Sequence, residues 1–428
     1  MLRTTDDEIE SWVVNILVAH HALSRNGIGF VKSVLKDESF VLLDALERAW
    51  RSPRPKPSAV WRLLRQLAEP IGRAFSDEEI NALTHASSIT VFSEFPVGLA
   101  ILPDDSAPLC CRVPITYRPL VPLTRALQLE LSSSPTHYLA GQLNVLIAEC
   151  IPTSDPVGRL SRVGWQAARD LVADVPYIRI SMLEAGSPVD IINALHEDRY
   201  DILIVSAHGT HDGNRTGIVC GDRFVDGTEL GDLPAIVCLS ACQVSPRGSG
   251  RVNITDLFLR QGAYVVLGTM VPVDVRRNAI LMTRFITNLA ESLAGRMEYK
   301  TLAGLWSFVR SSNAFSDILS GNVAMYTWAH DRTHGRSVIE ESMLERSVGR
   351  LRPNHIYKDS ETILMEIARD RGVGHRMRSW LSSPGYLPES LFYVMLGWPE
   401  RIFLYDKDFA EGQRWFEARV EAADGTDA

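Results

Sequence analysis

Two segments of the sequence place a chemically reactive side chain directly after an apolar run. Residues 201–209 read Asp-Ile-Leu-Ile-Val-Ser-Ala-His-Gly and end in His208 and Gly209. Residues 235–243 read Ala-Ile-Val-Cys-Leu-Ser-Ala-Cys-Gln and carry Cys242 at a matching place. We expect both runs to be buried strands, because they are apolar on both faces. Reactive groups gather beyond the carboxyl ends of the strands in an open parallel sheet, so the sequence predicts that these residues meet there.

A thiol and an imidazole form a recognised catalytic combination. The thiolate attacks a carbonyl carbon, and an imidazole, which titrates near neutrality, can take the thiol proton and later give a proton to the leaving amine. We therefore interpret Cys242 as a nucleophile and His208 as a general acid and base. The backbone N–H groups of Gly209 and Cys242 are candidates for an oxyanion hole. A hydrogen-bonded histidine and a small buried cysteine are the structural alternative, and the joint placement at two strand ends favours catalysis.

The surrounding pattern predicts an α/β fold with a doubly wound, mostly parallel sheet flanked by helices. Strand-like and helical runs alternate from about residue 144 to residue 310. Residues 1–86 read as a small helical module, in which Ser76 and Glu79 have the spacing of a capping box. Residues 89–117 contain short β-prone runs that suggest an antiparallel flap.

Composition excludes several classes of protein. The chain has 428 residues, 46% of them hydrophobic, which is typical of globular domains. A net charge of −8 gives no general attraction for nucleic acid or an anionic membrane, so we expect neither as a partner. The acidic N-terminus lacks the pattern of a signal peptide, and no apolar stretch approaches the ~20 residues of a membrane span. With six cysteines and no CxxC pair, we expect a reducing, cytoplasmic location.

The sequence gives little support for a cofactor site. The chain lacks both a P-loop motif and a Gly-x-Gly-x-x-Gly that opens a helix, which argues against a nucleotide-binding module. His208 and His211 have an HxxH spacing, but we expect them on a loop, without a nearby pair of carboxylates. We therefore expect no metal and no cofactor.

Several motifs together resemble the CHAT branch of the caspase-like cysteine peptidases. His208-Gly209 is similar to the His-Gly motif of the family, and residues 239–242 read Leu-Ser-Ala-Cys, like its nucleophile motif. Residues 257–263 resemble its helix-to-strand turn, residues 271–274 its Trp-Pro-Val-Asp loop with Val271 in place of Trp, and residues 392–399 its closing strand. The resemblance covers about residues 88 to 405, except for a segment near residues 320–385.

The resemblance implies a caspase-like fold and a regulated cysteine endopeptidase that cleaves a specific protein substrate through a Cys/His dyad. It also implies an activating sensor or regulatory partner and a setting in bacterial antiphage defence, of the gasdermin-associated or CRISPR-associated type. The alternative is a catalytically silent CHAT scaffold that binds partners, against which the presence of both His208 and Cys242 argues.

The resemblance also suggests a specificity residue and a domain plan. In caspase-like folds the loop after the next strand helps to wall the S1 pocket, so Asp274 is a candidate for binding a basic P1 side chain; the equal alternative is that Asp274 caps the following helix. We divide the chain into residues 1–86 as the helical module, residues 87–406 as the peptidase domain with an insertion near 320–385, and residues 407–428 as a C-terminal tail.

Overall fold

The computed structural model describes most of the chain. It covers residues 2–32, 37–51, 59, 62–63, 66–67, 74–93, 95–99, 108–120, 123–131, 137–139, 142–246, 252–297, 299–320, 323–352, 355–381 and 389–404. The proposed tail, residues 407–428, lies outside the described residues, as does part of the proposed insertion.

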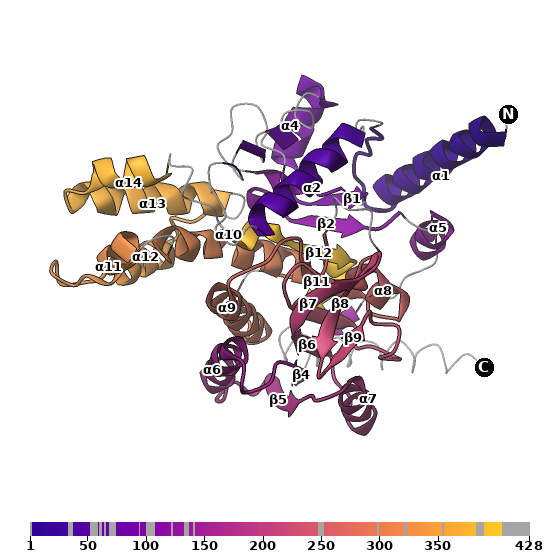
Figure 1. The fold of residues 1–428 in the computed structure, drawn as a ribbon. Coiled ribbons are helices and arrows are strands. Elements are labelled where there is room, and N and C mark those ends of the chain that lie inside the picture. Colours follow the sequence, from indigo (N-terminus) through magenta and orange to yellow (C-terminus); the bar gives the residue numbers. More distant parts are fainter. Residues whose placement is uncertain are drawn as a thin grey trace, which may run out of the picture.

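An eight-stranded mixed sheet is the centre of the molecule (Figure 1). Its strand order is β1-β2-β12-β11-β10-β6-β4-β5. All neighbouring pairs are parallel except β11 and β12. Its strands are β1 (Ile89–Phe92), β2 (Ile115–Arg118), β4 (Leu143–Glu149), β5 (Ile178–Glu184), β6 (Ile202–Ser206), β10 (Ile236–Ser240), β11 (Val265–Thr269) and β12 (Tyr393–Gly397). The predicted mostly parallel α/β sheet is therefore confirmed.

Two smaller sheets accompany the main one. The first has the order β7-β8-β9 and contains β7 (His208–Asp212), β8 (Arg215–Cys220) and β9 (Arg223–Val225). The second pairs β3 (His137–Leu139) with β13 (Ile402–Leu404). His208 and His211 both lie in β7, so the prediction that they lie on a loop is wrong; the chain turns into an antiparallel hairpin directly after β6.

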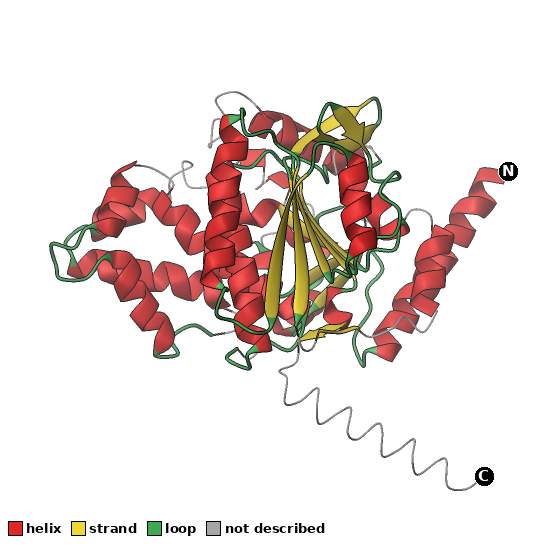
Figure 2. Cartoon of the chain, turned by 90° about the horizontal axis from the view of Figure 1, so that it is seen from below, coloured by secondary structure: helices red, strands yellow, loops and turns green. Residues whose placement is uncertain are grey.

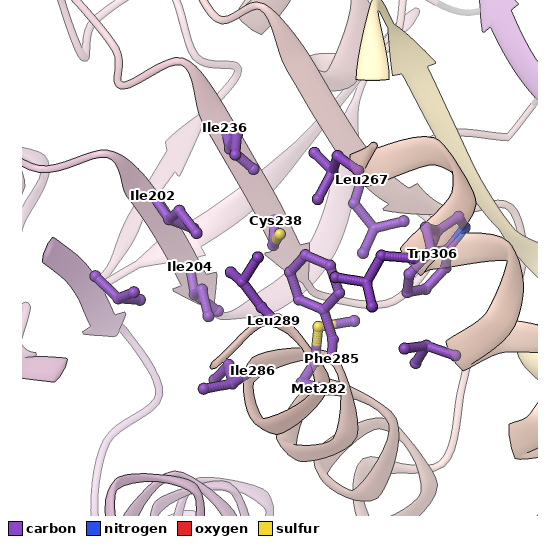
Figure 3. Close-up of a cluster of buried hydrophobic side chains, with 14 of the residues drawn as sticks. Ile202, Ile204, Ile236, Cys238, Leu267, Met282, Phe285, Ile286, Leu289 and Trp306 are labelled. Carbon is purple, nitrogen blue, oxygen red and sulfur yellow. The ribbon is translucent and has the colours of Figure 1, made fainter. Parts of the chain in front are cut away.

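Helices cover both faces of the main sheet (Figure 2). On one face, α6 (Pro156–Leu171), α9 (Val275–Leu293) and α10 (Leu302–Ser320) enclose an apolar core that includes Cys238 and Trp306 (Figure 3). On the other face, α7 (Pro188–Glu197) and α8 (Ile254–Arg260) pack on the strands through side chains such as Ile191 and Phe258. Strands that are buried on both sides need apolar residues at every position, which explains their unbroken apolar runs.

The N-terminal segment is largely helical where it is described, in agreement with the predicted helices. It contains α1 (Leu2–Ser24), α2 (Asp37–Arg51) and α4 (Asp77–His85), and Ser76 caps α4 in the predicted capping box with Glu79. Leu43 and Leu83 lie in the same buried cluster as Ile115 of β2. Helices α2 and α4 thus pack against the end of the sheet that β1 and β2 form, and the domain boundary near residue 86 stays a prediction.

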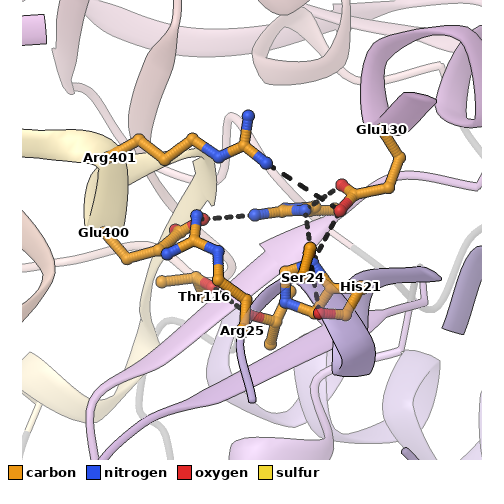
Figure 4. A network of polar contacts seen from close by, with 9 residues as sticks. His21, Ser24, Arg25, Thr116, Glu130, Glu400 and Arg401 are labelled. Atoms are coloured by element: carbon orange, nitrogen blue, oxygen red, sulfur yellow. Dashed lines mark hydrogen bonds and ion pairs between the residues drawn. The ribbon is translucent and has the colours of Figure 1, made fainter. Parts of the chain in front are cut away.

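A buried network of charges also joins α1 to the sheet (Figure 4). Arg118 of β2 forms ion pairs with Glu130 of α5 (Leu123–Leu131) and with Glu400. His21 of α1 contacts Glu130 at 2.7 Å between Nδ1 and Oε1. Arg118 is almost fully buried, so the two carboxylates compensate a positive charge that would be costly alone.

The expected antiparallel flap is wrong. β1 and β2 pair in parallel and extend the main sheet, while Val97–Leu99 and Leu109–Cys111 form short 3₁₀ turns. Residues 93–114 are long enough for the crossover that a parallel pair needs, and β12 offers β2 a partner that no local pattern specifies.

The segment near residues 320–385 forms a helical arm that projects from the body (Figure 1). Its helices are α11 (Val323–His330), α12 (Val338–Ser347), α13 (Ile356–Asp370) and α14 (Gly374–Leu381). None of the described helices in the chain has the length and apolar character that a membrane crossing requires.

Candidate active site

The register of two parallel strands brings His208 and Cys242 to the same edge of the sheet. Ser206 of β6 pairs with Ser240 of β10, and each reactive residue lies two positions beyond its serine. β6 then turns into β7, whose first residue is His208, whereas β10 ends in a turn that contains Cys242. The predicted placement of both side chains beyond strand ends is thus what the fold produces.

The backbones of Gly209 and Cys242 are in direct contact. A Cβ atom placed on Gly209 would lie 1.6 Å from the carbonyl oxygen of Cys242 and 3.2 Å from its nitrogen. Only glycine permits two backbones to approach so closely. The structure therefore brings His208, Gly209 and Cys242 together, and the proposed oxyanion donors belong to neighbouring backbone segments.

The Cys242 thiol lies against the loop that follows β11. Its Sγ donates a hydrogen bond to the Val273 carbonyl at 3.5 Å and accepts one from the Val273 N–H at 3.4 Å. The next residue, Gln243, has a φ of 52°, in the left-handed region, and its N–H donates to Thr269 Oγ1 at 2.8 Å. The sharp turn that carries the thiol is therefore held by contacts with the end of β11 and the loop after it.

The surroundings of Cys242 favour the protonated thiol. Burial raises its pKa, the hydrogen bond from Val273 opposes this effect, and the charges of Glu389 and Asp274 raise the pKa further. Because the thiolate is the nucleophile, the resting site holds the less reactive form near neutral pH.

Asp274 caps the helix that follows it. Its Oδ1 accepts the N–H groups of Arg276 at 2.9 Å and Arg277 at 3.2 Å, at the start of α9. The helix-cap interpretation of this residue is confirmed, and its role in an S1 pocket stays a prediction. Its own N–H donates to Glu389 Oε2 at 2.9 Å.

Glu389 is a second carboxylate near the thiol, and sequence reasoning missed it. Its side chain is mostly buried and pairs with Arg277 at 3.1 Å. Burial raises its pKa to about 7, although the charge of Arg277 opposes the shift. Glu389 follows the helical arm in the chain, more than a hundred residues after Cys242, and no motif in the sequence marks it.

His208 has a carboxylate partner that sequence reasoning also missed. His208 Nε2 lies 2.9 Å from Oδ2 of Asp155, the residue that caps α6. The side chains of both residues are partly exposed. One signal was present in the sequence, because Asp155 precedes Pro156 shortly after the strand β4, and Asp-Pro is a common start of a helix.

A protein family and two solved structures are similar to this chain. A family model described as the CHAT domain matches residues 59–315. Among solved structures, the chain is similar to the Arg-specific cysteine proteinase gingipain R (RgpB), with 11% identity over 85% of this chain and 74% of that one and a TM-score of 0.39. A complex of the pro- and mature domains of Porphyromonas gingivalis RgpB gives 10% identity, coverage of 86% and 76%, and the same TM-score of 0.39. No curated protein sequence matches this chain.

The close contact at Gly209 predicts a severe effect of a single methyl group. Gly209→Ala places a Cβ atom on the Cys242 carbonyl, so we expect the two strand ends to move apart and the reactivity of Cys242 to change, with a loss of about 1–3 kcal/mol of stability. Thermal unfolding and alkylation of Cys242 measure both effects. Gly304→Ala in α10 is the matched control, because its added Cβ meets only ordinary contacts of 3.5 Å and 3.6 Å. Equal behaviour of the two variants would contradict the prediction.

The environment of Cys242 predicts how its reactivity depends on pH. Because its pKa is raised, we expect iodoacetamide to alkylate Cys242 slowly near neutral pH and faster as pH rises. Glu389→Gln keeps an oxygen for the Asp274 N–H but removes the negative charge. Since the Glu389 pKa is about 7, the carboxyl is largely neutral at lower pH, and the variant should react faster than the native chain only above that value.

Mass spectrometry of the alkylated peptide gives the rate for Cys242 alone. Glu291→Gln is the control, because Glu291 pairs with Arg296 outside the site. A difference between the Glu389 variant and the native chain that stays constant across pH would contradict the role of its charge.

Proposed function

Since this chain belongs to the CHAT domain family, we propose that it is a cysteine endopeptidase that uses Cys242 as nucleophile and His208 as general acid and base. The observation that carries the proposal is the direct contact between Gly209 and Cys242, which joins the two strand ends into one site. Hydrolysis of a peptide bond by a cysteine peptidase needs at least a nucleophile and a group that carries protons, both held by rigid neighbouring elements.

The proposed reaction proceeds in two stages. His208 takes the proton of the Cys242 thiol, and the sulfur attacks the carbonyl carbon of the scissile bond to form a tetrahedral oxyanion. The oxyanion collapses as the C–N bond breaks, and the imidazolium gives its proton to the leaving amine. A water molecule, whose proton His208 accepts, then cleaves the thioester and releases the acid and the free thiol.

The backbone N–H groups of Gly209 and Cys242 are the proposed donors to that oxyanion. Gly209 lies in β7, which pairs with β8, and the turn that carries Cys242 is held by hydrogen bonds to Thr269 and Val273, so neither donor needs to reorganise when the charge develops. Such donors contribute about 2.7–4 kcal/mol each to the stability of the transition state in related chemistry. The close packing of Gly209 on Cys242 supports a fixed spacing between the two groups.

We further propose that the substrate is a protein with a basic P1 residue. Asp274 and Glu389 both act on the Cys242 thiol through their charge, and Arg277 is a nearby cation that pairs with Glu389. A cationic side chain would gain charge-assisted hydrogen bonds at such a site. The capping contacts of Asp274 involve Oδ1, which supports Oδ2 as the oxygen for a substrate.

Regulation by a partner is the third part of the proposal. The thiol is hydrogen-bonded to Val273 and protonated in the resting chain, and a change in the loop after β11 would be needed to free it. The helical arm offers exposed apolar side chains, including Val323, Tyr326 and Val348, to which a regulatory partner could bind. The resemblance to the family supports a place in bacterial antiphage defence.

The alternative function is a silent scaffold that binds partners through the same arm. The two functions differ in what Cys242 must do, because a scaffold does not need a reactive thiol. A test of the thiol therefore separates them.

We expect Cys242→Ala and His208→Ala to abolish cleavage of a protein substrate while the fold persists, since both residues lie beyond strand ends. Cys238→Ala is the matched control, because Cys238 is fully buried in β10; it should cost about 1 kcal/mol of stability and leave cleavage intact. Cleavage assays and thermal unfolding measure these effects. Cleavage that persists in the Cys242 variant would contradict the assignment of the nucleophile.

A library of short peptides that vary at P1 tests the specificity. We expect slow turnover by the chain alone, with a modest preference for Arg and Lys, and a weaker preference in Asp274→Asn, which keeps an oxygen for the cap of α9. Equal or better turnover of acidic or aliphatic P1 residues, or an unchanged preference in the variant, would leave Asp274 as a helix cap alone. Fast turnover without a partner would argue against the regulatory part.

A further inference from the structure

Asp155 uses its two carboxylate oxygens for two different contacts. Oδ1 accepts the N–H of Val157 at 2.7 Å and so caps the helix α6. Oδ2 lies 2.9 Å from Nε2 of His208. One oxygen is enough for a cap, as the single hydroxyl of Ser76 shows at the start of α4. The contact with His208 is therefore additional to the structural role of the residue.

The chemistry of the carboxylate fixes which imidazole nitrogen carries the hydrogen. The hydrogen bond with His208 and that from the Val157 N–H lower the pKa of Asp155, so this carboxyl is ionised at neutral pH. An ionised carboxylate can only accept hydrogen bonds. His208 Nε2 must then be the donor, and Nδ1 is left with the lone pair that can receive a proton.

A buried network holds the segment after β4, which carries Asp155. Glu149, the last residue of β4, accepts the Ile151 N–H at 3.0 Å, the Ser161 hydroxyl at 2.6 Å and the Trp165 indole N–H at 3.2 Å. Glu149, Ser161 and Trp165 are all buried. These contacts tie the segment after β4 to α6, so the position of Asp155 is set by the interior rather than by its own partly exposed side chain.

A second tie reinforces the same segment. Arg162 of α6 donates to the Ile151 carbonyl at 2.7 Å, and the Asp155 N–H donates to the Pro152 carbonyl at 3.0 Å. β4 pairs with β6, the strand that leads to His208, so both partners of the contact are attached to neighbouring strands. The carboxylate thus meets the imidazole from a fixed direction.

We propose that Asp155 is a positioning residue of this site, which holds His208 in the tautomer with hydrogen on Nε2 and stabilises the imidazolium that forms when Cys242 gives up its proton. The second half of this proposal rests on the proposed peptidase function. The thiol proton moves to Nδ1, the hydrogen on Nε2 stays between His208 and Asp155, and the negative carboxylate faces the new positive charge. A neutral partner would offer no such compensation.

Substitutions of Asp155 can separate the contact that caps α6 from the contact with His208. Asp155→Asn keeps an oxygen for the Val157 N–H but turns an amide NH₂ towards Nε2, which then has to accept, so the hydrogen moves to Nδ1. Asp155→Ser keeps a capping hydroxyl and removes the contact with the imidazole. Ser76→Ala is the control, because it removes a helix cap far from His208 in the sequence and has no contact with it.

The tautomer can be read directly by NMR on the full chain labelled with ¹⁵N-histidine. The chain has 11 histidines, and the spectrum of His208→Ala identifies the signals of His208. At about pH 8, where an ordinary imidazole is neutral, we expect the Nε2–H tautomer in the native chain and in Ser76→Ala. We expect the Nδ1–H tautomer in Asp155→Asn. A native Nδ1–H tautomer, or an unchanged tautomer in Asp155→Asn, would overturn the proposal.

Cleavage of a fluorogenic arginyl peptide amide is the second measurement. We expect kcat to fall about 10- to 1,000-fold in Asp155→Asn and Asp155→Ser with little change in KM, while Ser76→Ala keeps the native kcat. Thermal unfolding should show near-native stability for both Asp155 variants, because each keeps the cap. If kcat falls only in proportion to the loss of stability, Asp155 acts as a helix cap and not as a positioning residue. A tautomer that changes as expected in a chain without cleavage would support the positioning role and contradict the peptidase function.

Discussion

The parallel pairing of β6 with β10 is the constraint on which the site depends. Ser206 and Ser240 are partners in this pairing. The residues that follow them in each segment therefore leave the sheet at the same edge. A shift of the register by one residue would separate His208 from Cys242 and turn the strand side chains to the opposite face. The apolar cores on both faces oppose such a shift, because they would have to exchange all their contacts.

Around this pair, the site is assembled from several separate strand ends. The segment after β4 supplies Asp155, β7 begins with His208, the turn after β10 carries Cys242, and the loop after β11 presents Val273. Glu389 follows the helical arm in the chain and lies in the short 3₁₀ turn directly before β12. Hydrogen bonds link these segments in pairs, so the state of the thiol depends on parts of the chain that are far apart in the sequence.

Negatively charged side chains lie near both reactive groups of the site. Asp155 contacts the imidazole of His208, whereas Glu389 and Asp274 act on the Cys242 thiol, where their negative charge disfavours the thiolate. Arg277 compensates Glu389 only in part, as the raised pKa of Glu389 indicates. Under the proposed function, a cation that reaches the two carboxylates would ease ionisation of the thiol, and binding of a basic P1 side chain would then favour the reactive thiolate.

The sequence alone determined the α/β alternation and the positions of His208, Gly209 and Cys242, because these depend on local runs of apolar residues and on the few residues directly after each run. It also indicated that Asp274 could cap a helix, since Asp at that position has a local partner in the next turn.

Only the tertiary structure decided the partners of these residues. Asp155 meets His208 because β4 lies beside β6, and Glu389 reaches Asp274 because β12 pairs with β11 after the long helical arm. The same holds for β1 and β2, whose parallel pairing depends on the neighbouring β12. Local patterns set which strand a residue follows, whereas the order of the strands depends on packing between distant segments, which no short stretch of sequence contains.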